Sequence, residues 1–323
     1  MIHSLHLWTA PSNLSAPARV RILDKFLFTQ KNKTDNAERK RSAFFILERF
    51  FIPQTPTFDL KQTLDCGQVF RYVESDGVFD LKAGGERAIF TKTDSGWQVD
   101  CTDVGFFQKY LDFDTKYDII QSKVQDKGLV SSAIEHGKGV HILRQDLVET
   151  VFSFIISQNN HIPRIKAIIE RICDALGEDK GDYKAFPTVE ALASKDADWY
   201  ASIGAGYRAE YLSLTAKRFR DEGVPNFQSM DTDTARATLL SYKGIGRKVA
   251  DCVLLFGLGR MDVFPTDTWI VKIFKDEYPK VPAEKLAKVL VERFGEHSGY
   301  VQQWLFYYKR EKKYRQIANY RLK

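Results

Sequence analysis

The chain of 323 residues is long enough for two or three domains with well-buried cores, and its 44% hydrophobic and 13% aromatic content excludes a disordered protein. No apolar run approaches the ~20 residues that a membrane span needs, and residues 1–16 lack the basic-then-apolar pattern of a secretory signal. The net charge of +6 lies at the two ends, with +5 in residues 1–50 and +6 in residues 309–323, so the 258 residues between them carry −5. Bulk positive charge therefore cannot bind nucleic acid in this central part, and any such binding must rest on individually placed groups.

Residues 1–52 form an extension that we expect to be disordered or weakly helical. Basic and polar stretches alternate there with short apolar ones such as residues 44–47, which fit one amphipathic helix at most. Pro53 and Pro56 then mark the start of the ordered chain.

Residues 53–140 are predicted to form an antiparallel β-sheet domain with a few helices. Short β-prone runs are separated by turn signals at 75–77, 84–85 and 94–96, a spacing typical of a meander. The predicted strands are 69–72, 78–81, 88–91 and 97–99.

Residues 141–323 are predicted to form an all-helical body with a helix-hairpin-helix at 234–258 and a basic C-terminal tail. Apolar residues recur at helical spacing in 147–155, and again in 165–176 after Pro163, a natural first-turn proline. A sheet domain followed by a helical body makes the fold class α+β. Further helices are expected around 209–221, 233–241, 248–257, 268–276, 283–294 and 298–313.

The four cysteines, Cys66, Cys101, Cys173 and Cys252, stand alone in the sequence. Because no C-x-x-C pair occurs, zinc and iron–sulfur sites have no support, and we expect no bound metal. Isolated cysteines in a chain of this size are typical of a reducing compartment, where most serve as small buried apolar side chains.

The most informative stretch is LLSYKGIGRKVAD, residues 239–251, in which one predicted helix ends and another begins at once. Gly244 and Gly246, on either side of Ile245, let the backbone turn sharply and expose amides at a helix N-terminus. Such amides bind a phosphate oxygen without any side-chain charge. The turn by itself is also a common connection between two helices.

This segment resembles the helix-hairpin-helix of base-excision DNA glycosylases. Its continuation VFPTDT, residues 263–268, resembles the loop and aspartate that complete that motif. Lys248 and Asp267 stand 19 residues apart, as the motif requires in its lysine-bearing branch. The residues that the resemblance places on a DNA phosphate are Lys243, Gly244, Ile245 and Gly246.

The chemistry of Lys248 and Asp267 suits the cleavage of a glycosidic bond. A lysine ammonium must lose a proton before it acts as a nucleophile, and a desolvated pocket assists this loss. The aspartate can relay protons and stabilise positive charge on a sugar that is losing its base, after which the amine captures C1′ as a Schiff base. The alternatives are structural, because Lys248 can pair with Asp251 on the helix surface and Asp267 can act only as a helix cap.

Over residues 57–310 the chain is similar to the 8-oxoguanine DNA glycosylase family, beginning with LDCGQVFR, residues 64–71. The resemblance implies that the carbonyl of Gly67 accepts a hydrogen bond from the N7–H that only the oxidised base carries. It also implies that Cys252 and Phe306 pack on the two faces of the extruded purine. Gln302 then bonds the guanine Watson–Crick edge, unless the helix is rotated and Gln303 takes that place.

The opposite strand is expected to meet two loops. The segment IISQNNHIPR, residues 155–164, is similar to the part of the family that enters the duplex, which makes Asn159 and Arg164 readers of the estranged cytosine. In GAGYRA, residues 204–209, Tyr207 resembles the aromatic wedge and Arg208 a second cytosine reader. Outside the family frame, both stretches are polar loops that cap or start helices.

Three positions depart from the family pattern. Lys243 occupies a place where the hairpin usually has proline, which adds a phosphate-seeking charge. Trp269 stands where the best-known branch has histidine. His161 follows two asparagines where that branch continues with a third.

The sequence thus predicts a monomeric bifunctional DNA glycosylase/AP lyase that excises 8-oxoguanine opposite cytosine from double-stranded DNA. No cofactor is required, although a structural monovalent cation at the hairpin is compatible with the DNA-bound state. The alternatives are an alkylpurine-type monofunctional glycosylase, which normally lacks the lysine, and a non-catalytic, structure-specific DNA-binding protein, for which the hairpin suffices. We expect no membrane association, and a location in the cytoplasm of a prokaryote or in the nucleus or mitochondrion of a eukaryote.

Overall fold

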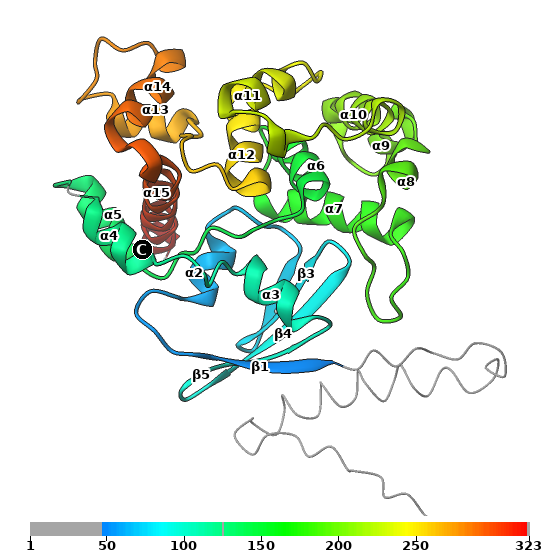
Figure 1. Cartoon of the computed structure of the whole chain (residues 1–323), viewed down its shortest axis with the longest axis horizontal. Helices are drawn as coiled ribbons and strands as arrows, with labels where there is room; N and C mark the ends of the chain where they lie inside the picture. Colours follow the sequence, from blue (N-terminus) through cyan, green and yellow to red (C-terminus); the bar gives the residue numbers. More distant parts are fainter. Residues whose placement is uncertain (1–46, 125, 322–323) are drawn as a thin grey trace, which may run out of the picture.

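The computed structural model describes residues 47–124 and 126–321, and it combines one antiparallel sheet with a larger set of helices (Figure 1). The sheet has the strand order β1-β5-β4-β3-β2, and all of its neighbouring strands are antiparallel. The predicted α+β class is confirmed. The strands are β1 Glu48–Pro53, β2 Tyr72–Ser75, β3 Val78–Ala83, β4 Glu86–Thr93 and β5 Gly96–Cys101.

The sheet arises from three short hairpins whose strands alternate between buried and more exposed residues. Phe90 of β4 lies opposite Phe79 of β3 and Val99 of β5, and all three are buried on one face. Cross-strand pairs of this kind stabilise a sheet because the residues at alternate positions share a face. The predicted turns at 75–77, 84–85 and 94–96 separate the strands as expected.

Two predictions for this region were wrong. The first predicted strand, 69–72, begins only at Tyr72, and the residue before this segment, Gln68, bonds to the chain around residues 141–145 and not to a strand. The Gln68 side chain donates to the His141 carbonyl at 2.7 Å and accepts from the Leu143 amide at 2.9 Å. The predicted extension also ends too late, because Glu48–Pro53 pairs with β5 as an edge strand. Residues 1–46, with most of the expected 44–47 helix, lie outside the described residues.

The helical part begins after the sheet and contains each helix that the sequence predicted, with small shifts at the ends. The helix expected at 298–313 continues to Arg321, so much of the basic tail is helical. The α-helices are α2 Leu60–Asp65, α3 Val104–Tyr110, α4 Tyr117–Lys123, α5 Leu129–His136, α6 Leu147–Ser157, α7 Ile162–Leu176, α8 Val189–Ala193, α9 Ala197–Ser202, α10 Ala209–Glu222, α11 Thr232–Leu240, α12 Arg247–Leu258, α13 Thr268–Phe274, α14 Ala283–Phe294 and α15 Ser298–Arg321. Short 3₁₀ helices are η1 Gly206–Arg208, η2 Phe227–Ser229 and η3 Gly295–His297.

The described residues form two hydrophobic cores, and the predicted division at residue 140 does not separate them. One core lies between the sheet and α3, whereas the other fills the helical part. Helix α5 belongs to the second core, because its buried residues Val130, Ala133 and Ile134 pack there and the helix lies beside α15 (Figure 1). An amphipathic helix must bury its apolar face, and the face of α5 finds α15 instead of the sheet.

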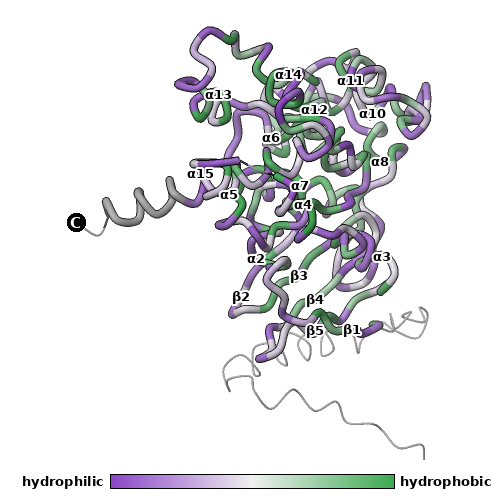
Figure 2. Tube along the Cα trace, turned by 60° about the vertical axis from the view of Figure 1, so that its left-hand side comes forward, coloured by the Kyte–Doolittle hydropathy of each residue, from purple (hydrophilic) through white to green (hydrophobic). Residues whose placement is uncertain are grey.

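Hydrophobic residues recur along the strands and along the helices above them (Figure 2). No helix among the described residues is both long enough and apolar enough to span a bilayer.

A buried polar junction fixes the sheet against the helices. Arg71 is only 2% exposed, and its guanidinium donates to the Lys184 carbonyl at 2.6 Å while lying 3.8 Å from a Glu149 oxygen. The same Glu149 oxygen accepts from the amide of Gly84 between β3 and β4. Because buried charges require partners, this junction ties the sheet to α6, and α6 leads directly into the loop of the candidate site.

Candidate functional site

The predicted hairpin is present at residues 241–246, between α11 and α12. Gly244 has φ +86°, and a Cβ there would lie 2.2 Å from ring carbons of Tyr211 on α10. Glycine is therefore needed for both its conformation and its lack of a side chain. Gly246 is the N-cap of α12 and contributes no side-chain cap, so the first amides of α12 have no side-chain acceptor at that position.

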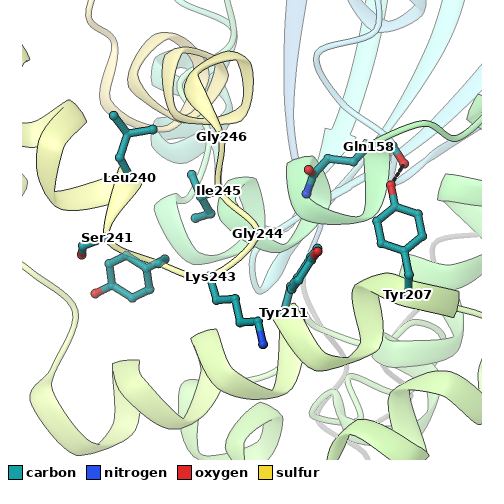
Figure 3. A pocket seen from close by; sticks show the side chains of 10 residues that line it. Gln158, Tyr207, Tyr211, Leu240, Ser241, Lys243, Gly244, Ile245 and Gly246 are labelled. Carbon is teal, nitrogen blue, oxygen red and sulfur yellow. Dashed lines mark hydrogen bonds between the residues drawn. The ribbon is translucent and has the colours of Figure 1, made fainter.

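A groove of about 490 Å³ opens beside this hairpin (Figure 3). The Tyr207 hydroxyl donates to the Gln158 carbonyl at 3.2 Å across one end of it. Lys243 forms an ion pair, because its Nζ lies 2.6 Å from Glu210 Oε1. The groove is lined by Gln158, Tyr207, Tyr211, Leu240, Ser241, Tyr242, Lys243, Gly244, Ile245 and Gly246.

Lys248 lies in the first turn of α12 and is half-buried. Its Nζ is 5.3 Å from the centre of the Phe154 ring, so the amine rests against an aromatic side chain of α6. The structural alternative, a surface pair with Asp251, is not what the structure contains. Asp251 is 1% exposed and accepts from Arg236 at 2.7 Å, with Arg247 at 3.7 Å as its second cation.

Asp267 is the N-cap of α13, as the structural alternative proposed. Its Oδ1 accepts from the amides of Trp269 and Ile270, both at 2.9 Å, and this fixes the direction of the carboxylate. Both capping bonds use Oδ1, so Oδ2 is not committed to the cap. Capping and catalysis therefore do not compete for the same oxygen.

The buried thiol of Cys252 brings the lysine and the aspartate into one neighbourhood. Burial raises the pKa of this thiol to about 11, the charge of Lys248 opposes the rise, and the charge of Asp267 adds to it. One sulfur atom thus senses both groups, although 19 residues separate them along the chain. Of the expected purine-stacking residues, Cys252 is buried on the inner face of α12.

Two residues of α15, Phe306 and Gln303, lie at the turn formed by residues 66–68. A Cβ at Gly67, whose φ is +85°, would lie 3.1 Å from Phe306 Cε1. Gln303 is occupied, because its Nε2 donates to the Cys66 carbonyl at 2.9 Å. Gln302 differs: it is 5% exposed, and its Oε1 has no hydrogen-bond partner among the described residues.

The two loops expected to meet the opposite strand lie side by side. Asn159 is exposed and has φ +44°, a conformation that asparagine tolerates better than most residues. Arg164 donates to the Gly204 carbonyl at 3.1 Å, and Tyr207 is 55% exposed at the same edge. Arg208 is 3% exposed and donates to the carbonyls of Gln158, Asn159 and Ala205. Its guanidinium thus holds the Gln158–Asn159 turn in place.

The structure shows the surroundings of the residues that depart from the family pattern. His161 is the N-cap of α7, and its Nδ1 accepts from the Arg164 amide at 3.4 Å. Histidine therefore takes over the capping that an asparagine side chain commonly provides. Trp269 is 40% exposed in the first turn of α13.

Sequence reasoning missed several neighbours of these residues. Glu210 and Tyr211 contact the hairpin from α10, and Phe154 lies under Lys248. Tyr211 could have been noticed, because it follows Tyr207 by four residues and so lies one helical turn away. Nothing local in the sequence indicates the pairing of Glu210 with Lys243.

Within residues 47–124 and 126–321, no group of three or more His, Cys, Asp or Glu side chains is arranged to hold a metal ion. The chemistry available at this site is that of an amine, a carboxylate, hydrogen-bonding amides and aromatic faces.

Two family models match adjacent parts of the chain. The 8-oxoguanine DNA glycosylase N-terminal domain matches residues 50–151. The HhH-GPD superfamily base excision DNA repair protein matches residues 152–293. The two matches meet inside α6, so together they span the sheet and most of the helices.

Curated relatives carry related descriptions. The N-glycosylase/DNA lyase of Saccharomyces cerevisiae is 36% identical over 159 residues, which cover 44% of this chain and 42% of the relative. The probable N-glycosylase/DNA lyase of Methanothermobacter thermautotrophicus is 30% identical over 227 residues, which cover 61% of this chain and 72% of the relative. The chain spans about half the length of the first two curated relatives it matches, 42% of the yeast protein and 52% of the N-glycosylase/DNA lyase of Arabidopsis thaliana.

Solved structures show the same similarity over a longer range. The 8-oxoguanine glycosylase/lyase of Clostridium acetobutylicum, in complex with double-stranded DNA containing cytosine opposite 8-oxoguanine, aligns with a TM-score of 0.77 and 32% sequence identity. The alignment covers 83% of this chain and 98% of that chain.

Proposed function

Because the chain belongs to the HhH-GPD superfamily of base excision DNA repair proteins and carries an 8-oxoguanine DNA glycosylase N-terminal domain, we propose that it excises 8-oxoguanine opposite cytosine from duplex DNA and then cleaves the abasic site. The observation that carries this proposal is the half-buried Lys248 against the Phe154 ring, in the first turn of the helix that follows the hairpin, together with Asp267, whose carboxylate is oriented by its cap at the start of α13. The N-terminal domain match favours an oxidised purine over the alkylpurine alternative. Lys248 favours an enzyme over a non-catalytic DNA-binding protein, for which the hairpin alone would suffice.

The proposed reaction starts with the neutral amine of Lys248, which attacks C1′ of the damaged nucleotide as the N9–C1′ bond breaks. Asp267 stabilises the positive charge that develops on the sugar and accepts a proton from the amine. The sugar ring then opens: the C1′–O4′ bond breaks, O4′ takes up a proton, and a protonated Schiff base forms between Lys248 and C1′. Removal of a proton from C2′ then expels the 3′ phosphate, which is the lyase step.

The base pocket that we propose lies between Cys252 and Phe306, with Gly67 at one edge. Guanine presents two donors, N1–H and N2–H, on its Watson–Crick edge, and the buried Oε1 of Gln302 is an acceptor with no partner among the described residues. A buried acceptor without a partner costs free energy, which a bound guanine edge would recover. Gln303 is the weaker candidate because it is already bonded to the Cys66 carbonyl.

We assign recognition of the orphaned cytosine to Asn159 and Arg164, and insertion into the stack to Tyr207. The exposure of Asn159 and Tyr207 and their position at one edge support this assignment. Arg208 fits a cytosine contact only if it exchanges its bonds to Gln158 and Asn159. We therefore propose that Arg208 chiefly positions the turn that carries Asn159.

DNA backbone binding is assigned to the hairpin. The uncapped start of α12 and the groove beside Gly244 and Gly246 suit a phosphate group, and a monovalent cation there would complete the contact in the DNA complex. We propose that the protein acts as a monomer without a cofactor. We place it in the cytoplasm of a prokaryote, or in the nucleus or mitochondrion of a eukaryote.

The test is reductive trapping of the Schiff base. The protein is mixed with a duplex that contains one 8-oxoguanine opposite cytosine, and borohydride is added during turnover. We expect a covalent protein–DNA adduct and release of free 8-oxoguanine, with both lost in Lys248→Gln. Full excision by Lys248→Gln would show that the assigned nucleophile is wrong.

A matched control is Lys288→Gln on α14, because the side chain of Lys288 is 79% exposed and lies 3.9 Å from Glu292. This variant should form the adduct at the wild-type rate. Binding of the duplex without base release by the wild-type protein would instead favour the DNA-binding alternative. Base release without an adduct would favour a monofunctional glycosylase.

A further inference from the structure

Helix α15 presents three polar or aromatic residues at regular spacing. Gln302, Phe306 and Arg310 follow one another at intervals of four residues, so they lie in a row along one side of the helix. The first two belong to the proposed base pocket. Arg310 is the next residue in the row, and it has no part in the function proposed so far.

Arg310 reaches the same glycine as Phe306. A Cβ at Gly67 would lie 3.1 Å from Arg310 Nη1 and 3.1 Å from Phe306 Cε1. The guanidinium and the aromatic ring therefore lie together against the α-carbon of Gly67. Because φ at Gly67 is +85° and a Cβ there would crowd both side chains, this turn requires glycine.

The charge of Arg310 acts on the other groups around this turn. Burial raises the pKa of the Cys66 thiol to about 11, and the positive charge of Arg310 opposes the rise. Burial lowers the pKa of Lys166 to about 8, and the charge of Arg310 contributes to the lowering. A guanidinium keeps its charge at every pH at which proteins are folded, so a permanent positive charge lies beside Gly67.

We propose that Arg310 is a pocket residue that contacts the C8-oxygen edge of the extruded base and stabilises the purine as it leaves. This inference rests on the proposed function, in which the Gly67 carbonyl accepts a hydrogen bond from N7–H. The oxygen on C8 is bonded to the carbon next to N7, so it lies at the same edge of the base. A guanidinium against Gly67 is at that edge and carries N–H donors that suit an oxygen acceptor.

The bond changes explain why a positive charge is useful there. When Lys248 forms its bond to C1′, the electron pair of the N9–C1′ bond stays with the purine. Conjugation with the C8 carbonyl spreads this negative charge over N9 and O8. Arg310 stabilises the negative oxygen, and the proton released by the amine returns to the purine afterwards. An undamaged guanine has no oxygen at C8 and therefore gains nothing from this contact.

The experiment compares two substrates in Arg310→Met. On a duplex with 8-oxoguanine opposite cytosine, we expect single-turnover base excision to slow by roughly 10- to 100-fold. On the same duplex with a preformed abasic site, no base is present to be stabilised, so strand cleavage and borohydride trapping should stay at the wild-type rate. Arg310→Lys, which keeps the charge but loses the fork of donors, should recover part of the excision rate.

Lys309→Met is the matched control, since it removes a positive charge at the adjacent position of α15 but lies off the row. It should excise 8-oxoguanine at the wild-type rate. Excision at the wild-type rate by Arg310→Met would overturn the inference, and so would an equal loss on both substrates or a uniform loss of affinity for all duplexes. The proposed function fails separately, if the wild-type protein neither releases 8-oxoguanine nor cleaves the abasic duplex.

Discussion

Adding one methyl group at Gly244 should destabilise the hairpin and weaken DNA binding. A residue other than glycine in the left-handed region costs about 1 kcal/mol, and φ at Gly244 is +86°. The new Cβ would also lie 2.2 Å from two ring carbons of Tyr211, so the ring must move, which adds about 2 kcal/mol of overpacking. Alanine also reduces the conformational freedom of the unfolded chain, which stabilises the folded state by about 0.5 kcal/mol. We therefore expect Gly244→Ala to lower the free energy of unfolding by between roughly 2 and 3 kcal/mol.

The assay is urea denaturation together with fluorescence anisotropy of a labelled duplex. Gly246→Ala is the control, because its φ is −86° and a Cβ there meets nothing within 4 Å, so its loss of stability should stay below about 1 kcal/mol. In the double variant with Tyr211→Ala, the overlap disappears and only the conformational part of the cost should remain. If Gly244→Ala were as stable as wild type and bound the duplex equally well, the close packing of Gly244 on Tyr211 would be refuted.

Three further predictions concern charge and burial. Glu210→Gln releases Lys243 from its ion pair, so duplex affinity should rise and the salt dependence of binding should steepen by about one counterion; an unchanged slope in anisotropy titrations would contradict this. Asp251→Asn leaves the buried guanidinium of Arg236 with only the exposed carboxylate of Asp233 as an ion-pair partner among the described residues, so the free energy of unfolding in urea should fall by roughly 3 kcal/mol. Burial raises the pKa of Cys252 to about 11 and all four thiols are buried, so a disulfide reagent should label the protein only after unfolding.

Matched control variants test the first two of these three predictions. Glu292→Gln removes a carboxylate of α14 that lies 3.9 Å from Lys288 and leaves the ion pair of Lys243 with Glu210 in place, so its effect on salt dependence should be smaller. Asp221→Asn removes a carboxylate whose side chain is 59% exposed, so its cost in stability should be close to zero. Equal losses from Asp251→Asn and Asp221→Asn would refute the argument from burial.

The elements that the sequence predicted well are those with a local cause. Glycine-rich turns fixed the hairpins of the sheet, and apolar residues at helical spacing located the helices from α6 onwards. The failures are also physical. Val69 has the local signature of a strand, yet the side chain of the adjacent Gln68 bonds to residues more than 70 positions away. Edge strand β1 was missed because its pairing with β5 is likewise non-local.

The candidate site likewise has residues that a local pattern predicts and residues whose contacts depend on distant parts of the chain. Lys248, Asp267 and the hairpin glycines were found because their spacing is a local signature. The choice between Gln302 and Gln303 could not be made from sequence, since it depends on the rotation of α15 against the Cys66 carbonyl. The engagement of Arg208 by the Gln158–Asn159 turn is equally a tertiary fact, because that turn lies about fifty residues earlier in the chain.

The sequence by itself determined the fold class and the family resemblance and led to the proposed catalytic pair, because turn residues, helical periodicity and motif spacing are properties of short segments. Only the tertiary structure decided which side chains pair with one another and which polar atoms have no partner among the described residues. It paired Lys243 with Glu210, buried Arg236 against Asp251, left the Gln302 oxygen without a partner among the described residues, and placed Arg310 beside Gly67. These contacts join residues far apart in the chain, and packing and burial determine their energies, which no local pattern contains.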